Sequence, residues 1–139
     1  MKKEYGRSMI EMLGVLAIIG VLSIGGLAGY TMAMNRHRAN TALDYAQRAF
    51  VVAQTTGDGS TNITSTACSA DAILGETMNT SALSACTVVR TNGVTTVDIT
   101  AANDSVAEAI RSRTGVTGTG SKFTMSDSGT NANKWVVGS

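Results

Sequence analysis

The sequence contains no proline, one histidine and one tryptophan, and Phe, Trp and Tyr together make up only 4% of it. A single histidine without partners at the usual spacing gives no basis for a catalytic triad or a zinc site. No P-loop or dinucleotide-binding fingerprint occurs. Lys and Arg number 11 against 10 Asp and Glu, so there is no basic excess of the kind that nucleic-acid binding uses. We therefore expect that the protein is not an enzyme and that it has no metal site, no cofactor and no direct nucleic-acid site.

The apolar residues are concentrated in the first third of the chain. Residues 12–35 contain no charged side chain. As a helix rising about 1.5 Å per residue, this run would extend roughly 36 Å, enough to cross a hydrocarbon core of about 30 Å. A secretory signal peptide fits poorly, because its apolar region is usually only about 7–15 residues long. The run predicts a membrane-spanning helix over residues 12–35.

Two features beside this run are not explained by a plain membrane anchor. Glu11 stands at its edge, where a carboxylate is costly in lipid unless it has a partner. Gly6 lies five residues before Glu11 and follows Lys2 and Lys3. Cleavage after Gly6 would give Arg7 a free amine, one helical turn from Glu11. In a staggered array of identical helices, this amine could pair with Glu11 of a neighbouring copy and set the register between helices.

The segment GRSMIEMLGVLAIIG at residues 6–20 resembles the class III leader and N-terminal helix of type IV pilins and pseudopilins. The resemblance covers roughly residues 1–50. It implies a leader over 1–6, cleavage between Gly6 and Arg7 by a prepilin peptidase, N-methylation of Arg7 and an assembly role for Glu11. Arg7 departs from the Phe or Met that the family usually has at the first mature position, and it adds a second cation beside the free amine.

The resemblance further implies a structural subunit rather than an enzyme. Such a chain enters the inner membrane as a precursor, meets the pilus assembly platform there and polymerises with copies of itself into an extracellular helical filament, the type IV pilus. Two alternatives stay open at this point. A pseudopilin of a type II secretion system shares this N-terminus, and a single-pass membrane-anchored binding protein that never polymerises would carry a similar apolar helix.

The pattern after the apolar run predicts that the same helix continues. Ala39, Leu43, Ala46, Phe50 and Ala53 recur at helical spacing with polar residues between them. We expect one long helix over 7–56, ended by the glycines that follow, and a globular domain over 57–139.

Cys68 and Cys86 lie in this globular region. An even number of cysteines in an exported domain usually indicates a disulfide, and the alternative is two free thiols in a reducing compartment. Between them, residues 70–79 are compatible with a short helix. A disulfide there would staple a region that is poor in large apolar residues.

The clearest strand signal is the pair of β-branched runs over 87–100 that flank Asn92-Gly93, a favoured two-residue hairpin turn. A short helix over 105–113 should follow, with Val106, Ala109 and Ile110 on one face, Arg113 as a further candidate for that face, and Gly115 ending the helix. Further strands are expected at 122–126 and 134–137. This order predicts an α+β fold, an α/β roll in which the long helix packs on an antiparallel sheet of about four strands. The order of elements is similar to that of type IVb pilins.

Overall fold

The computed structural model describes residues 2–59 and 61–138, and side chains from residue 8 onward within them, apart from that of residue 58. The chain forms two compact units, Met1–Met34 and Asn35–Ser139. Helix α1 (Lys2–Thr55) makes up the first unit and continues as one element of the second. It begins inside the predicted leader and ends one residue before the predicted boundary at 56.

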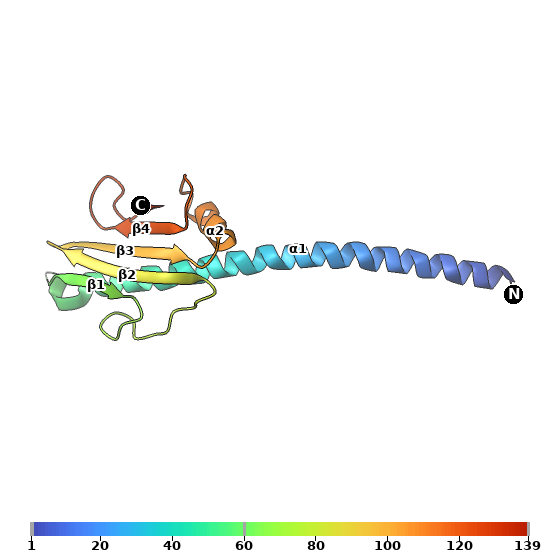
Figure 1. Cartoon of the computed structure of the whole chain (residues 1–139), viewed down its shortest axis with the longest axis horizontal. Coiled ribbons are helices and arrows are strands. Elements are labelled where there is room, and N and C mark those ends of the chain that lie inside the picture. Colours follow the sequence, from blue (N-terminus) through green and yellow to red (C-terminus); the bar gives the residue numbers. More distant parts are fainter. Residues whose placement is uncertain (1, 60, 139) are drawn as a thin grey trace. The chain divides into compact units, whose positions relative to one another are not determined.

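The second unit has two layers, residues 35–55 of α1 and an antiparallel sheet of five strands in the order β1-β2-β3-β4-β5 (Figure 1). The predicted α+β class is confirmed, with five strands where about four were expected. A short helix, α2, lies between β3 and β4 in the chain. The elements after α1 are η1 (Thr56–Gly59), β1 (Ile63–Ala67), β2 (Leu83–Thr91), β3 (Val94–Ala101), α2 (Asp104–Thr114), β4 (Lys122–Ser126) and β5 (Trp135–Val137).

Small residues dominate the face of α1 that meets the sheet. The five core positions predicted on this helix are all buried, and three of them are alanines. Alanine loses almost no side-chain conformational entropy on folding, and its small side chain lets a helix approach its neighbour closely. Larger side chains of the sheet fill the remaining space, so the core combines mainly small side chains of the helix with large side chains of the strands. The most buried of these sheet residues, each no more than 1% exposed, are Leu83, Val88, Val97, Ile99 and Phe123.

The central hairpin forms as the sequence predicts. Asn92 and Gly93 have φ angles of 53° and 82°, the left-handed conformation that a two-residue hairpin turn requires. Thr91 pairs with Val94 directly across the turn, and the ladder extends back to Leu83 and Ala101. The alternation of buried and exposed side chains along β3 then places one face of the hairpin against α1.

Helix α2 is capped at both ends. The side chain of Asn103 accepts a hydrogen bond from the amide of Val106 at 3.0 Å. Gly115 adopts the left-handed conformation, with φ of 73°, and donates its amide to the carbonyl of Arg111. Val106 and Ile110 are buried as predicted, whereas Ala109 is half-buried and Ala107 is the third buried residue.

Residues 70–79 contain no helix, so that expectation was wrong: residues 71–74 form a turn and the rest of the segment is irregular. The amide of Ile73 donates to the carbonyl of Ala70 at 2.9 Å, which closes a single turn. Gly75 then takes a left-handed conformation with φ of 65° and donates back to the same carbonyl. A left-handed residue ends a helical turn, and this glycine stops the segment before a second turn can form.

Candidate assembly surface

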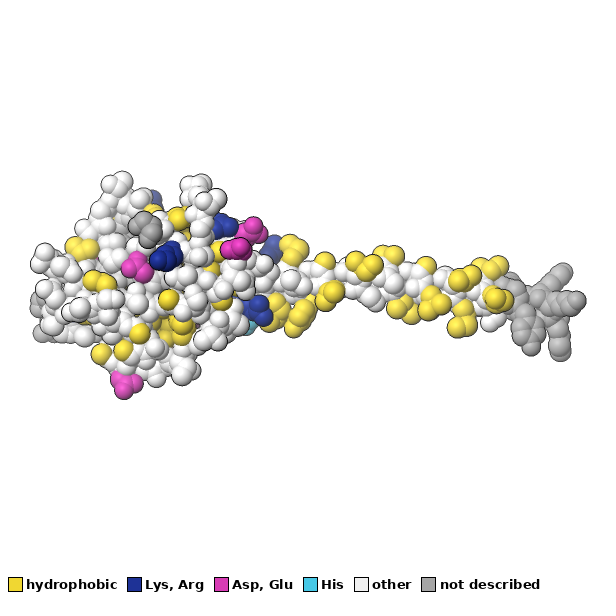
Figure 2. Space-filling model, in the orientation of Figure 1, with side chains coloured by type: hydrophobic (Ala, Val, Ile, Leu, Met, Phe, Trp, Pro, Cys, Tyr) yellow, Lys and Arg dark blue, Asp and Glu magenta, His cyan; other side chains and the backbone are white. Residues whose placement is uncertain are grey.

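The first unit exposes nearly every large apolar side chain that it carries. From Met9 to Met32 these side chains are between 52% and 75% exposed. Figure 2 shows hydrophobic side chains along the whole visible face of this part of the helix. By length and composition, α1 from Ser8 to Thr55 is the one helix among the described residues that is suited to cross a membrane.

This exposure predicts that other molecules cover the helix. Burying one large aliphatic side chain is worth about 1.5–3 kcal/mol relative to leaving it in water. Apolar residues on every side of a helix are typical of a segment that lies in lipid or among other helices. The helix therefore indicates membrane association or export.

The hydroxyl groups inside the apolar run are satisfied by the helix itself. Ser23 donates its hydroxyl to the carbonyl of Ile19 at 2.7 Å, and Thr31 donates to Leu27 at 2.9 Å. Such bonds to the preceding turn allow Ser and Thr to leave water without losing a hydrogen-bond partner. Neither residue therefore opposes burial of this segment.

Five glycines in the first unit have no packing role within the chain. A Cβ built on any of them meets no atom within 4 Å. Each glycine costs a helix about 1 kcal/mol relative to alanine. Small residues are favoured where helices of different chains or spans approach each other closely. These glycines, at positions 14, 20, 25, 26 and 29, thus indicate a packing partner outside the chain.

Glu11 is exposed and lies on α1 beside a shallow, mainly apolar hollow lined by Ser8, Met12, Val15 and Leu16. Among the described side chains it forms no ion pair. Gly6 has no side chain, and the side chain of Arg7 lies outside those that the structure describes. Cleavage between Gly6 and Arg7, N-methylation of Arg7 and pairing of Glu11 with a neighbouring amine accordingly stay predictions.

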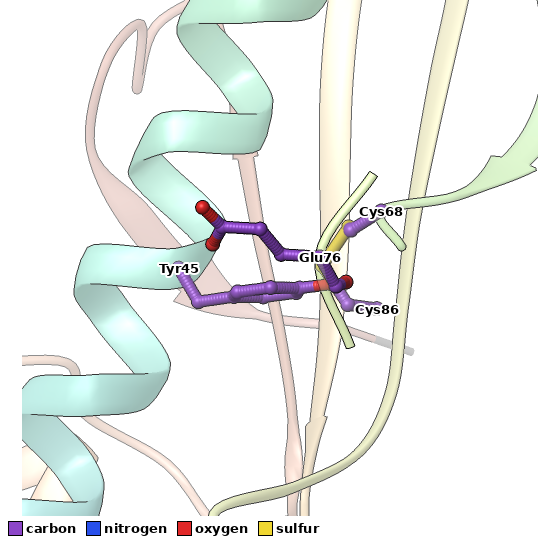
Figure 3. The surroundings of a disulfide bond; sticks show 4 residues. All are labelled: Tyr45, Cys68, Glu76 and Cys86. Atoms are coloured by element: carbon purple, nitrogen blue, oxygen red, sulfur yellow. A yellow bond between two sulfur atoms is a disulfide. The ribbon is translucent and has the colours of Figure 1, made fainter. Parts of the chain in front are cut away.

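The predicted disulfide is present in the second unit. Cys68 and Cys86 are bonded with their Cα atoms 5.4 Å apart, and both side chains are buried. The amide of Cys68 also donates to the carbonyl of Cys86 at 3.0 Å. The disulfide ties the residue that directly follows β1 to the first half of β2 (Figure 3).

Side chains of α1 hold the segment that follows Cys68. The hydroxyl of Tyr45 donates to the backbone carbonyl of Glu76 at 3.0 Å, next to the disulfide (Figure 3). Arg48 pairs with the Glu76 carboxylate at 2.8 Å and with Asp44 at 3.2 Å. Burial, and secondarily the charge of Glu76, raises the pKa of the Tyr45 hydroxyl. The hydrogen bond to Glu76 is the main cause that raises the pKa of Arg48.

Arg90 is a buried cation that the sequence reasoning missed. Only 1% of its surface is exposed, and its Nε donates to the carbonyl of Thr61 at 2.6 Å. Its two terminal nitrogens donate to the carbonyls of Ala53 and Thr56, at the end of α1. The last carbonyls of a helix lack partners within it and carry partial negative charge, so the guanidinium caps α1. The spacing from Cys86 and Val88, two inward-facing positions, could have revealed it.

Comparisons with protein-family models, curated proteins and solved structures found no match to this chain. The pilin-like architecture, a long apolar N-terminal helix with an antiparallel sheet and a disulfide, thus rests on the features of the chain itself. Within the described ranges, no group of three or more His, Cys, Asp or Glu residues could hold a metal ion.

Proposed function

We propose that this chain is a structural, pilin-like subunit that polymerises into an extracellular type IV pilus. A prepilin peptidase would cleave the precursor between Gly6 and Arg7 in the inner membrane, and an assembly platform would extract the mature chain. Helices 12–35 of many copies would then bundle as the filament core, and the disulfide-bonded units would coat the outside. In this role the chain performs no catalysis.

One observation carries the proposal. Glu11 is an acidic side chain at the end of a helix segment that is otherwise apolar and exposed on all sides. A plain anchor needs the apolar side chains but gains nothing from this carboxylate, because an acidic residue at membrane depth costs up to about 3 kcal/mol. A filament subunit uses it, because the amine created at Arg7 of a neighbouring copy supplies the missing partner.

The same pairing would set the register of the filament. A helix bundle held only by apolar side chains can slide, since neighbouring registers bury similar areas. A buried charge pair penalises every position in which one charge lacks its partner, by about 3–5 kcal/mol when a partner is removed outright. The exposed glycines then allow close helix approach at the register that Glu11 selects.

Processing can be tested directly by mass spectrometry of the chain purified from its native host. A mature N-terminus at Arg7 supports the pilin route, whereas a start at Met1 supports a non-polymerising membrane anchor. Substitution Gly6→Val should block this cleavage. Electron microscopy of the same cells separates a long surface pilus from the short periplasmic filament of a pseudopilin.

Assembly can be tested by Glu11→Ala, which should be cleaved normally but yield about tenfold less filament or lower still, because the neighbouring amine loses its partner. Glu108→Ala is the matched control, since Glu108 is an exposed residue of α2 in the second unit. Filaments sheared from cells and quantified on a denaturing gel provide the measurement. Normal filament yield from Glu11→Ala would refute the pairing.

A further inference from the structure

Charge is unevenly distributed over the second unit. Residues 57–89 contain three acidic side chains and no Lys or Arg, whereas residues 111–134 contain four Lys or Arg and a single acid, Asp127. The strand order places β1 and β2 at one side of the sheet and β4 and β5 at the other. Asp127 is already engaged, because it accepts hydrogen bonds from the amide of Thr95 and the side chain of Gln54.

The acidic side carries a loop held in a fixed shape. This acidic loop, residues 70–80, presents two exposed carboxylates, Asp71 and Glu76, of which Glu76 is paired with Arg48. The disulfide anchors its start, and Tyr45 and Arg48 of α1 anchor Glu76. A loop that is ordered before binding loses little conformational entropy when a partner docks on it.

The basic side contains an open groove of about 760 Å³. Its lining includes three apolar residues, Leu43, Val116 and Trp135, and the exposed cations Arg113 and Lys134. We call this feature the basic groove; its remaining lining comes from Asn40, Asp44, Gln47, Thr114, Gly115 and Asn133. The one carboxylate among these, Asp44, is paired with Arg48.

The acidic loop and the basic groove both adjoin α1 at the same level along it, and Arg48 pairs with Glu76 of the loop and with Asp44 of the groove. The loop is held by residues 45 and 48, and the groove is lined by residues 40–47 of the same helix. Complementary surfaces on different faces of one chain form a head-to-tail contact, which produces an open helical polymer when the rotation does not close a ring. Subunits side by side in such a polymer can join loop to groove with little shift along α1.

We propose that the acidic loop of one copy docks into the basic groove of the next, so that the outer units of the filament bind each other laterally. This inference rests on the proposed filament function and names the second contact of the same assembly. Arg113 and Lys134 meet Asp71 first, because Glu76 already has Arg48 as a partner. The apolar residues of the groove cover the neighbouring Leu74 and Met78, which are half-buried in the isolated chain. Charge complementarity of this kind favours the correct orientation over others.

A carbodiimide, which joins a carboxylate to a contacting amine, tests the contact on intact wild-type filaments. A denaturing gel should show covalent dimers, and mass spectrometry should find Lys134 joined to Asp71 or Glu76. Lys134→Gln should abolish this product, while Lys122→Gln, which removes an exposed lysine on β4, should leave it unchanged. The full-length monomer in detergent should not give it. Filaments that yield no such product overturn the inference and leave the proposed function standing.

Charge reversal gives an independent test. Lys134→Glu and Asp71→Lys should each lower the yield of sheared filaments about tenfold, because each places like charges together. The double variant should recover most of the wild-type yield. Both residues are exposed, so the melting temperature of the detergent-solubilised monomer should not change. Full yield from both single variants contradicts the lateral contact, whereas a wild-type chain that forms no filaments contradicts the proposed function and this inference together.

Discussion

Ile19 and Ile99 have the same side chain in opposite surroundings. Ile19, in the first unit, is 52% exposed, and Ile99, on β3 in the second unit, is 1% exposed. The second unit therefore stabilises itself through a core that the chain completes alone. The first unit has no such core, and its apolar side chains gain burial only from lipid or from other copies. One chain thus joins a part that folds by itself to a part that needs surroundings.

The largest effect should come from truncating the two isoleucines. Ile99→Ala should lower the free energy of unfolding by about 2–5 kcal/mol, because it leaves a cavity in the core. Ile19→Ala should change it by no more than about 0.5 kcal/mol, as expected for a position without internal contacts. Fluorescence of Trp135, the one tryptophan, monitors the second unit during denaturation of the full chain in detergent.

Equal losses from the two variants would contradict the division into a self-stabilised and a dependent unit. Filament yield, unlike the unfolding transition, should depend on the apolar side chains of the first unit. Ile19→Arg should abolish filament recovery, because a cation in the middle of an apolar segment costs about 3 kcal/mol or more, yet it should leave the fluorescence transition unchanged.

Arg90 tests how the second unit holds the end of α1. Arg90→Ala should lower the free energy of unfolding by about 3 kcal/mol, since three carbonyls lose a charged donor and the one of Ala53 takes part in a buried hydrogen bond. Arg90→Lys is the matched control, because lysine keeps the charge but lacks the planar guanidinium that bonds to three carbonyls at once. Denaturant titration should rank wild type above Lys and Lys above Ala. An Ala variant as stable as wild type would show that this cap contributes nothing.

The sequence predicted the elements whose signals are local. The hairpin follows from Asn92-Gly93 between β-branched runs, and the end of α2 follows from Gly115. The alternation that buries Cys86 and Val88 also indicates that Arg90 points inward. Its partners, the carbonyls at the end of α1, could not be predicted from the strand pattern, because they depend on how the helix packs.

Features that depend on distant partners escaped prediction. Strand β1 has one large apolar residue, Ile63, among small and hydroxyl residues, and pairing with β2 rather than its own pattern makes it a strand. At 70–79 the sequence reasoning missed a local stop, Gly75, and the disulfide together with the contacts of Tyr45 and Arg48 to Glu76 then holds the segment in place. Glu11 was singled out by its place at the edge of the apolar run, whereas the peptidase and the N-methylation of Arg7 came from the resemblance. The basic groove needed three elements brought together in space.

The disulfide should affect only one of the two units. Reduction, or the double substitution Cys68→Ala with Cys86→Ala, should lower the free energy of unfolding by about 3 kcal/mol, because the unfolded chain loses a closed loop. The helix of the first unit makes no use of this bond. Far-ultraviolet circular dichroism of the reduced chain in micelles should therefore retain the helical signal of residues 8–34 after the Trp135 fluorescence transition is complete. Complete loss of helical signal in the same transition would mean that the two units unfold together.

The smallest effect concerns Tyr45 at high pH. Its pKa is raised above the usual value of 10.0, chiefly by burial. The folded chain therefore holds this proton more tightly than the unfolded chain does, so the contribution is complete below about pH 10 and is lost as the pH rises through the folded-state pKa. Melting temperatures between pH 8 and 11 should fall less steeply for Tyr45→Phe than for wild type, while Tyr30→Phe, in the exposed helix, should follow wild type. At pH 8 the Tyr45 variant should be less stable by about 1 kcal/mol, because the carbonyl of Glu76 loses its donor. Parallel pH slopes for all three chains would show that Tyr45 ionises as freely in the folded unit as in water.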